Sequence, residues 1–409
     1  MKGSKVIGYS IYDAVTHKII LTQKQAIPIE LYREKCMQYA KNGCEYTQSI
    51  IFQASLISKG EYYVVLHSDA QEDSIKIFFN IRSTKKHDIE PVVVVFANHT
   101  WHAYNYEGGG CLYGLLRGKG ADYERYQPHE PFYSVSMNKP IIGFFDALNS
   151  KRGIPSLNKA FLSSFNKIPG PTFSHSPEAG LAFIKILRRE KIPYRAISNT
   201  DLHEHPDLLK GAKVLIFTGH DEYWTLPMRL SIDEFIKKGG NVANFSGNIA
   251  WWCINLDNNS LYQNQGGKIE SDYRSLPKQF FGSGRFDNPH INIPTEKTFG
   301  ISYKYAGYPI KEYYYLKNAQ HASLSKEFYE KSTSVDIVDP HHPVFIGINL
   351  KYHSVWGRES NILREELDGV PLTISENVDP NVKEFFPKNL KILAKGVAYN
   401  ANTLIVNGI

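Results

Sequence analysis

Uninterrupted apolar runs alternate with amphipathic stretches in the middle of the chain. The runs VVVVFAN (92–98) and VLIF (214–217) are typical of strands that are buried on both faces of a parallel sheet. Helices are predicted over residues 176–191, where Ser-Pro-Glu opens the segment, and over residues 228–239, where a glycine pair closes it. This alternation of strand and helix predicts βαβ units with right-handed crossovers.

The two regions that flank this core have a different pattern. Short aromatic and β-branched runs at 61–68 and 74–82 predict a small β-rich cap over residues 1–88. Residues 256–409 are rich in Asn, Gly, Tyr and Pro, and predict strands and long loops packed on the core. The expected fold class is therefore α/β, with a doubly wound, mostly parallel sheet over residues 89–255.

Composition limits the classes of partner. Of 409 residues, 42% are hydrophobic and 22% are charged, as in an ordinary soluble globular protein. The net charge of +6 is small for this length, so no nucleic-acid partner is expected. Four cysteines without CxxC spacing predict reduced thiols. Because no apolar leader and no run of membrane-span length is evident, we expect a cytoplasmic protein without a membrane partner.

The residues that could carry chemistry concentrate in the segment GHDEYW (219–224). It follows the second apolar run, so His220, Asp221 and Glu222 are expected at the carboxyl end of a central strand, where α/β sheets bind ligands. Burying three ionisable side chains there is costly unless they have partners. The alternative is an ordinary helix start at which Asp221 caps free N–H groups. That alternative accounts for Asp221 but not for the other two residues.

Several separated segments resemble a known family. Besides GHDEYW they are TWHAYNYEGG (100–109), NTDLHEHPDLL (199–209), GGNVANFSGNIAWW (239–252) and HPVFIG (342–347). Their order is similar to that in the large-subunit domain of N,N-dimethylformamidase and its relatives. The resemblance implies a core like that of the class-I glutamine amidotransferases. Since relatives continue further, this chain is expected to be short at its C-terminus.

The resemblance also implies an activity and a set of site residues. It implies hydrolysis of an amide C–N bond by a water that one iron activates, with two tyrosinates and a glutamate as iron ligands. One tyrosine ligand corresponds to Tyr104 and the glutamate ligand to Glu222. A nearby histidine corresponds to His220, and a second glutamate, as general base or proton shuttle, to Glu376. Oxygen ligands of this kind suit an oxophilic ion such as iron.

Side chains beside these residues are assigned to a substrate pocket. They are Asp221, Tyr223, Trp224, Trp101 and Asn105. For Trp224, packing in the core is the alternative. The substrate implied by the resemblance is a small-molecule or sugar-linked amide, and assembly into a homo-oligomer stays open.

One position departs from the family pattern. Relatives carry the second tyrosine ligand directly after an Arg-Pro pair, whereas a Lys-Pro pair is followed here by Ile141, which cannot bind a metal. Three interpretations therefore stay open. The protein is an iron-dependent amidase, a metal-independent hydrolase that uses His220 with Glu222 or Asp221, or a non-catalytic relative that keeps the fold as a binding or assembly module.

Restoring the missing phenolate tests this departure. We expect Ile141→Tyr to raise the iron content of the purified protein and to deepen its visible absorption, because affinity for a hard cation rises with the charge and number of its ligands. The larger side chain costs about 1–3 kcal/mol of stability if the space has closed. Wild type and variant are compared by metal analysis. Full iron occupancy of the wild type would show that another residue supplies the ligand.

Overall fold

A computed structural model describes most of the chain outside several loops. The described residues are 6–27, 39–44, 57–68, 75–82, 90–105, 110–112, 114–116, 126–127, 133–139, 176–263, 282–309, 334–358, 367–373, 377–400 and 403–408. They fall into two compact units. The first holds Met1–Ser156, Pro171–Ser246 and Cys253–Gly284, and the second holds Gly247–Trp252 and Arg285–Ile409.

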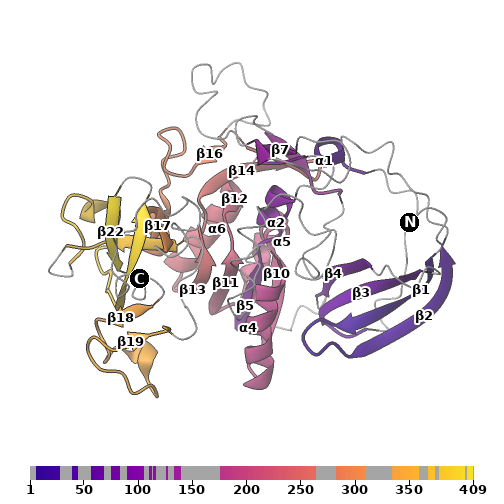
Figure 1. Ribbon diagram of the computed structural model, residues 1–409, viewed down its shortest axis with the longest axis horizontal. Helices are drawn as coiled ribbons and strands as arrows, with labels where there is room; N and C mark the ends of the chain where they lie inside the picture. The colour runs from indigo at the N-terminus through magenta and orange to yellow at the C-terminus, as the bar shows by residue number, and fades with distance from the viewer. Residues whose placement is uncertain are drawn as a thin grey trace. The chain divides into compact units, whose positions relative to one another are not determined.

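An antiparallel sheet opens the first unit (Figure 1). Its order is β2-β1-β3-β4, from β1 (Val6–Asp13), β2 (Ile19–Ile27), β3 (Gly60–Ser68) and β4 (Ile75–Ile81). The two aromatic and β-branched runs are β3 and β4, which pair with Tyr63 opposite Phe78. The strand-rich character predicted for this region is confirmed. Helix α1 (Tyr39–Asn42) lies between β2 and β3 along the chain.

A parallel sheet forms the centre of the first unit. Its order is β10-β5-β11-β13, from β5 (Val92–Phe96), β10 (Tyr194–Ser198), β11 (Val214–His220) and β13 (Asn241–Gly247). Strand β5 pairs in parallel with both β10 and β11, so that Val94 lies level with Ala196 and Ile216. The two apolar runs are therefore adjacent inner strands of a parallel sheet, as predicted.

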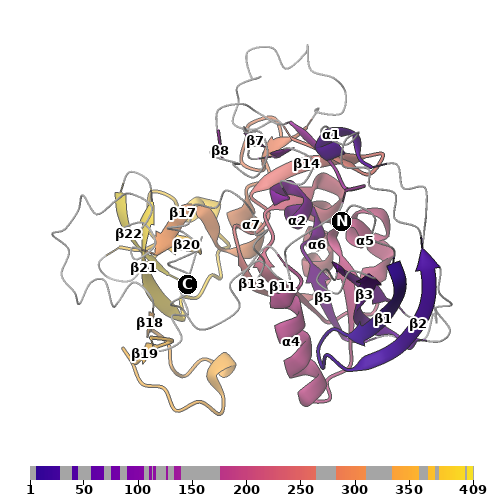
Figure 2. The same cartoon turned by 45° about the vertical axis from the view of Figure 1, so that its right-hand side comes forward.

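Helices connect these strands. They are α2 (Asn98–Tyr104), α4 (Glu178–Arg189), α5 (Asn199–Glu204), η3 (Pro206–Leu209) and α6 (Leu226–Lys237). Helix α4 lies along the parallel sheet (Figure 2). It packs there through Leu181 and Ile184, which join Phe96 in one hydrophobic cluster. At Gly180 a Cβ atom would lie 2.5 Å from the Phe96 ring, so only glycine allows this approach. The doubly wound, amidotransferase-like form of the core stays a prediction.

The N-terminal sheet packs on the same face of the parallel sheet as α4. Tyr63 and Val65 of β3 belong to the hydrophobic cluster that contains Phe96 and Ile184. Polar contacts join the same elements, since Asn80 Nδ2 donates to the backbone oxygen of Ala196 at 2.8 Å. The N-terminal sheet therefore contributes side chains to the same hydrophobic core as the parallel sheet and α4.

Arg188, near the end of α4, links this helix to the N-terminal sheet by hydrogen bonds. Its guanidinium donates to Asp13 Oδ2 at 2.7 Å and to Glu61 Oε2 at 2.8 Å. Its Nε donates to the hydroxyl of Tyr194 at 2.8 Å, and that hydroxyl donates to Glu61 at 2.9 Å. Glu61 is only 3% exposed, so these donors offset the cost of burying its charge.

Two further sheets complete the first unit. Strands β12 (Tyr223–Thr225), β14 (Trp252–Asp257), β15 (Ser260–Tyr262) and β9 (Ser134–Ser136) pair in that order. A small sheet contains β6 (Gly110–Cys111), β7 (Gly114–Leu116) and β8 (Tyr126–Gln127). Among the described residues, no helix has the length and apolar character needed to cross a membrane.

The second unit is built mainly of antiparallel strands. The order is β17-β20-β22-β21-β18-β19, from β17 (Ser302–Pro309), β18 (Val335–Ile337), β19 (Val355–Trp356), β20 (Leu367–Pro371), β21 (Ala394–Asn400) and β22 (Thr403–Gly408). Strand β16 (Gly284–Arg285) pairs with β14. The remaining elements of the second unit are α7 (Thr295–Phe299), η7 (Pro343–Phe345) and η8 (Lys383–Phe385). The strand-rich C-terminal region is confirmed, whereas its packing on the core and the boundaries after residues 88 and 255 stay predictions.

Removing the Arg188 side chain tests the attachment of the N-terminal sheet. Arg188→Ala is expected to lower the free energy of unfolding by ~3 kcal/mol, because Glu61 stays buried without its cation. Arg189→Ala is the matched control. The Arg189 side chain is 72% exposed and pairs with the exposed Glu190, so its loss should cost less than ~0.5 kcal/mol. Denaturant unfolding measures both, and equal losses would contradict the role of Arg188.

Candidate functional site

The carboxyl ends of β10, β5 and β11 lie side by side at one edge of the parallel sheet. Asn199 and Thr200 follow β10, helix α2 follows β5, and His220 ends β11. Hydrogen bonds join these segments directly. Asn98 Nδ2 donates to Thr200 Oγ1 at 2.8 Å, and the Thr200 amide donates to Asn98 Oδ1 at 3.2 Å. Ligands of open α/β sheets bind at such an edge.

Gly219 turns the end of β11 toward this edge. Its φ of 77° lies in the left-handed region, where a side chain would be strained. His220, Asp221 and Glu222 follow, and all three are buried, with 3%, 0% and 1% of their surface exposed. The chain thus places three ionisable groups where water does not solvate them, and each needs partners within the protein.

The start of helix α6 is capped by Thr225. Its side chain accepts a hydrogen bond from the Met228 amide at 3.4 Å, and its hydroxyl lies 2.8 Å from His203 Nδ1. Asp221 lies before β12 and does not cap the helix. The alternative that explained GHDEYW as an ordinary helix start with Asp221 as its cap is therefore wrong.

Tyr104 and Glu222, the two predicted metal ligands, are in direct contact. The Tyr104 hydroxyl donates to Glu222 Oε2 at 2.7 Å. The Tyr104 ring also meets the His220 ring edge to face, with centroids 5.6 Å apart, and His220 Nδ1 lies 3.8 Å from Glu222 Oε2. The structure brings these three residues together from separate segments, as the sequence predicts. Their roles as ligands and as catalytic histidine stay predictions.

Asp221 is bound by a different set of partners. Asn199 Nδ2 donates to Asp221 Oδ1 at 3.2 Å, and Trp224 Nε1 donates to the same oxygen at 2.9 Å. Burial raises the pKa of Asp221 to about 7, and the two donors act in the opposite direction. The Trp224 ring is fully buried and lies 5.0 Å from the Phe217 ring. Asp221 and Trp224 therefore form part of the support of the turn, and their place in a substrate pocket stays a prediction.

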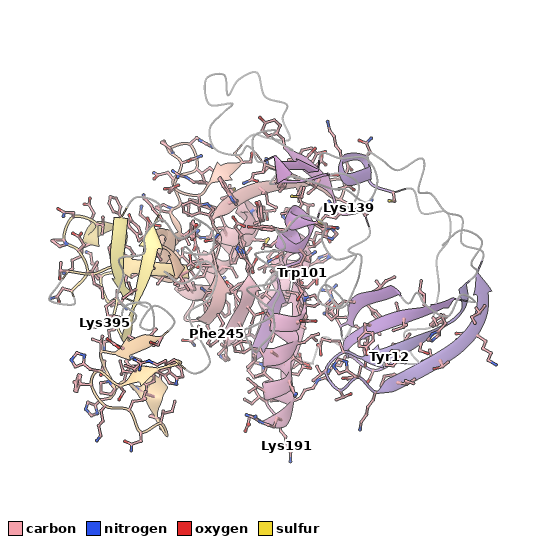
Figure 3. All side chains as sticks on the ribbon, viewed as in Figure 1. Tyr12, Trp101, Lys139, Lys191, Phe245 and Lys395 are labelled. Carbon is pink, nitrogen blue, oxygen red and sulfur yellow. The ribbon has the colours of Figure 1, made fainter. Side chains whose placement is uncertain are left out.

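The other predicted pocket residues have distinct surroundings. Trp101 is 6% exposed and packs in the hydrophobic cluster with Phe78 and Phe96 (Figure 3). Asn105 ends α2, and its backbone oxygen accepts a hydrogen bond from Lys139 Nζ at 2.6 Å. Tyr223 is fully buried, with its ring 6.1 Å from that of Tyr104. Trp101 therefore packs in the core, and the places of Trp101, Asn105 and Tyr223 in a substrate pocket stay predictions.

Two residues that sequence reasoning does not single out support the site. Thr100 Oγ1 accepts hydrogen bonds from the amides of Glu222 and Tyr223 at 3.0 and 3.3 Å. Asn199 accepts from the His99 amide at 3.4 Å and donates to Asp221. Both lie in segments that carry the family resemblance, yet the segments do not show which distant residues they contact. Only the strand order β10-β5-β11 brings them together.

The donors near Tyr104 suit a hard metal ion. Tyr104 and Glu222 offer neighbouring oxygens and His220 a nitrogen, the kinds of donor that an iron ion accepts. In the described ranges, no three or more His, Cys, Asp and Glu side chains are grouped to hold a metal. Ile141 and Glu376 lie outside the described residues. The part of the site that the structure describes therefore offers two oxygen donors of the kind that iron accepts, and iron binding stays a prediction.

Two histidines of α2 are buried in uncharged form. Burial, together with the smaller effects of the charges of His203 and His102, lowers the pKa of His99 to about 3. Burial likewise lowers the pKa of His102 to about 3, with Lys139 adding to the effect. His99 Nε2 lies 3.2 Å from Thr200 Oγ1, so its ring joins the ends of β5 and β10.

His99 should make the fold sensitive to acid. In the unfolded chain a histidine binds a proton near pH 6.5, whereas folded His99 stays neutral down to about pH 3. Stability is therefore lost as the pH falls below 6.5, on the order of 2–3 kcal/mol between pH 7 and pH 4. In His99→Gln this loss should be smaller, and in His341→Gln, which changes an exposed histidine, it should equal that of wild type. Unfolding curves at both pH values provide the test, and equal losses in all three proteins would contradict it.

Comparison with known protein families finds a family model whose match includes the segments that form this site. No curated protein matches the chain. The family model described as N,N-dimethylformamidase beta subunit-like, C-terminal, matches residues 12–404. This range includes helix α2, which carries Tyr104, and the link between β11 and β12, which carries Glu222. The chain therefore belongs to the N,N-dimethylformamidase beta subunit-like family.

Proposed function

We propose that this protein is a dimethylformamidase-like hydrolase that cleaves an amide C–N bond with a metal-activated water. The observation that carries the proposal is the contact between the Tyr104 hydroxyl and Glu222 Oε2, 2.7 Å apart at the carboxyl end of a central strand. Membership of the family supports the amide substrate. The proposal includes the doubly wound, amidotransferase-like form of the core and the cytoplasmic compartment.

Amide hydrolysis needs a polarised carbonyl and an activated water, because an amide is a poor electrophile. A bound iron ion would supply both effects. Tyr104 and Glu222 would hold it, and binding requires that Tyr104 lose the proton it donates to Glu222 in the free protein. The burial of Glu222, which is 1% exposed, strengthens its attraction to a cation because little water screens its charge.

His220 is the proposed proton carrier. It is 3% exposed, its ring lies against Tyr104, and its Nδ1 lies 3.8 Å from Glu222. A histidine next to the ligand oxygens is suited to take a proton from the attacking water and to return one to the departing amine. Glu376, which lies outside the described residues, is proposed as its partner. The substrate is proposed to be a small-molecule or sugar-linked amide, and a homo-oligomer is proposed as the assembled form.

Metal analysis and amide hydrolysis by the purified protein test this proposal. Wild type should carry iron, absorb visible light through tyrosinate-to-iron charge transfer, and release amine from N,N-dimethylformamide or a related amide. Glu222→Gln should lower the iron content at least about tenfold, because it removes an anionic ligand. Glu234→Gln is the control, since Glu234 is exposed on α6 and pairs with Lys238.

The same measurements separate the other interpretations. In His220→Gln the rate should fall by ~10²–10⁴ while the iron content is retained, as expected for loss of a proton carrier. Hydrolysis by metal-free protein that His220→Gln abolishes would favour the metal-independent hydrolase. A colourless wild type without iron and without activity, whose fold survives Glu222→Ala, would favour a binding or assembly module.

A further inference from the structure

Helix α2 contacts the Glu222 residue at two points. Its first turns present Thr100 and Tyr104, which are four residues apart and therefore lie on one face of the helix. Tyr104 binds the carboxylate of Glu222, and Thr100 binds its backbone amide. The same Thr100 oxygen also accepts from the amide of Tyr223 at 3.3 Å. One helix thus holds both the main chain and the side chain of a proposed ligand.

The Glu222 amide lies in the link between β11 and β12, and the Tyr223 amide belongs to the first residue of β12. Both lie beyond the end of β11 in the parallel sheet. Thr100, Glu222 and Tyr223 are all almost fully buried. A buried N–H group that loses its acceptor costs about 1–3 kcal/mol, and water has little access to replace the hydroxyl. The two hydrogen bonds therefore fix the backbone of this link relative to α2.

The orientation of the Glu222 carboxylate depends on that backbone. The side chain has three rotatable bonds, so the contact with Tyr104 needs the Cα atom of Glu222 to be held at a defined distance from the helix. Gly219, at a φ of 77°, lets the chain reach this position but does not hold it there. The hydrogen bonds from the Glu222 and Tyr223 amides to the Thr100 hydroxyl keep it there.

We infer that Thr100 is a positioning residue whose hydroxyl sets Glu222 against Tyr104. It acts through the Glu222 and Tyr223 amides and has no contact role toward substrate. The role of the Tyr104–Glu222 pair in metal binding rests on the proposed function. The positioning of Glu222 by Thr100 does not depend on it. A purely structural threonine would change stability on mutation and leave the Tyr104–Glu222 contact intact.

Three variants of Thr100 isolate the hydroxyl. Thr100→Ser and Thr100→Ala both lose the methyl group and differ only in the oxygen, and Thr100→Val keeps the shape and loses the oxygen. In Thr100→Ala and Thr100→Val the Glu222 and Tyr223 amides should exchange hydrogen at least about tenfold faster, as expected from the loss of one hydrogen bond. Iron content and tyrosinate absorption should fall several-fold. Thr100→Ser should match wild type in all three measurements, with circular dichroism confirming the fold.

Each outcome decides the inference. Unchanged exchange of the two amides in a folded Thr100→Ala would overturn it, and so would faster exchange with unchanged iron content. If wild type binds no iron, the proposed function fails separately. The chemical shift of the Tyr104 Cζ carbon, which bears the hydroxyl, then replaces iron content as the measurement. Its signal is identified by its absence in Tyr104→Phe. The shift should change in Thr100→Ala in the same direction as in Glu222→Gln, because both variants disturb the Tyr104–Glu222 contact. If neither Thr100→Ala nor Thr100→Val folds, hydrogen exchange in wild type provides the test. The inference requires that the Glu222 and Tyr223 amides exchange as slowly as the amides of β11, and faster exchange would overturn it.

Discussion

The parallel pairing of β5 with both β10 and β11 is the constraint on which the site depends. Parallel strands end at the same edge, so the segments that follow them must meet there. Hydrogen bonds made by side chains then join the three segments in sequence. Asn98 and Thr200 link the ends of β5 and β10, Asn199 reaches Asp221 after β11, and Thr100 binds the Glu222 amide. Tyr104 and Glu222 are brought together as a consequence of strand order.

Burial of so many polar groups is stable only because they satisfy one another. Asp221 receives donors from Asn199 and Trp224, and the raised pKa of its carboxyl group shows that these donors only partly offset the loss of water. Glu61 illustrates the same principle at the N-terminal sheet, where Arg188 and Tyr194 surround its carboxylate. In both places a carboxyl group joins elements that are distant in sequence, and it does so with directional bonds that apolar contacts lack.

The local pattern of the chain was sufficient to predict the core strands and the helices that follow them. Uninterrupted apolar runs mark β5 and β11, and helix α4 begins after Ser-Pro, as predicted. The position of GHDEYW after an apolar run also placed Glu222 at the end of a central strand. The roles of Thr100 and Asn199 could not be predicted, because their partners are set by strand order. The prediction of Asp221 as a possible helix cap failed because β12 intervenes and Thr225 takes that role.

The hydrogen bond between Tyr104 and Glu222 also bears on how a cation would bind. The two oxygens are already neighbours, so little reorganisation of the chain is needed to present them to one ion. The proton between them occupies the place where positive charge is favoured, and a cation must displace it. Proton and metal therefore compete for the same pair of oxygens. Burial acts on both in the same direction, since it strengthens the attraction of Glu222 for any positive charge. If Tyr104 and Glu222 hold a cation as proposed, the strength of binding depends on that burial, and hence on the packing that keeps Glu222 in place.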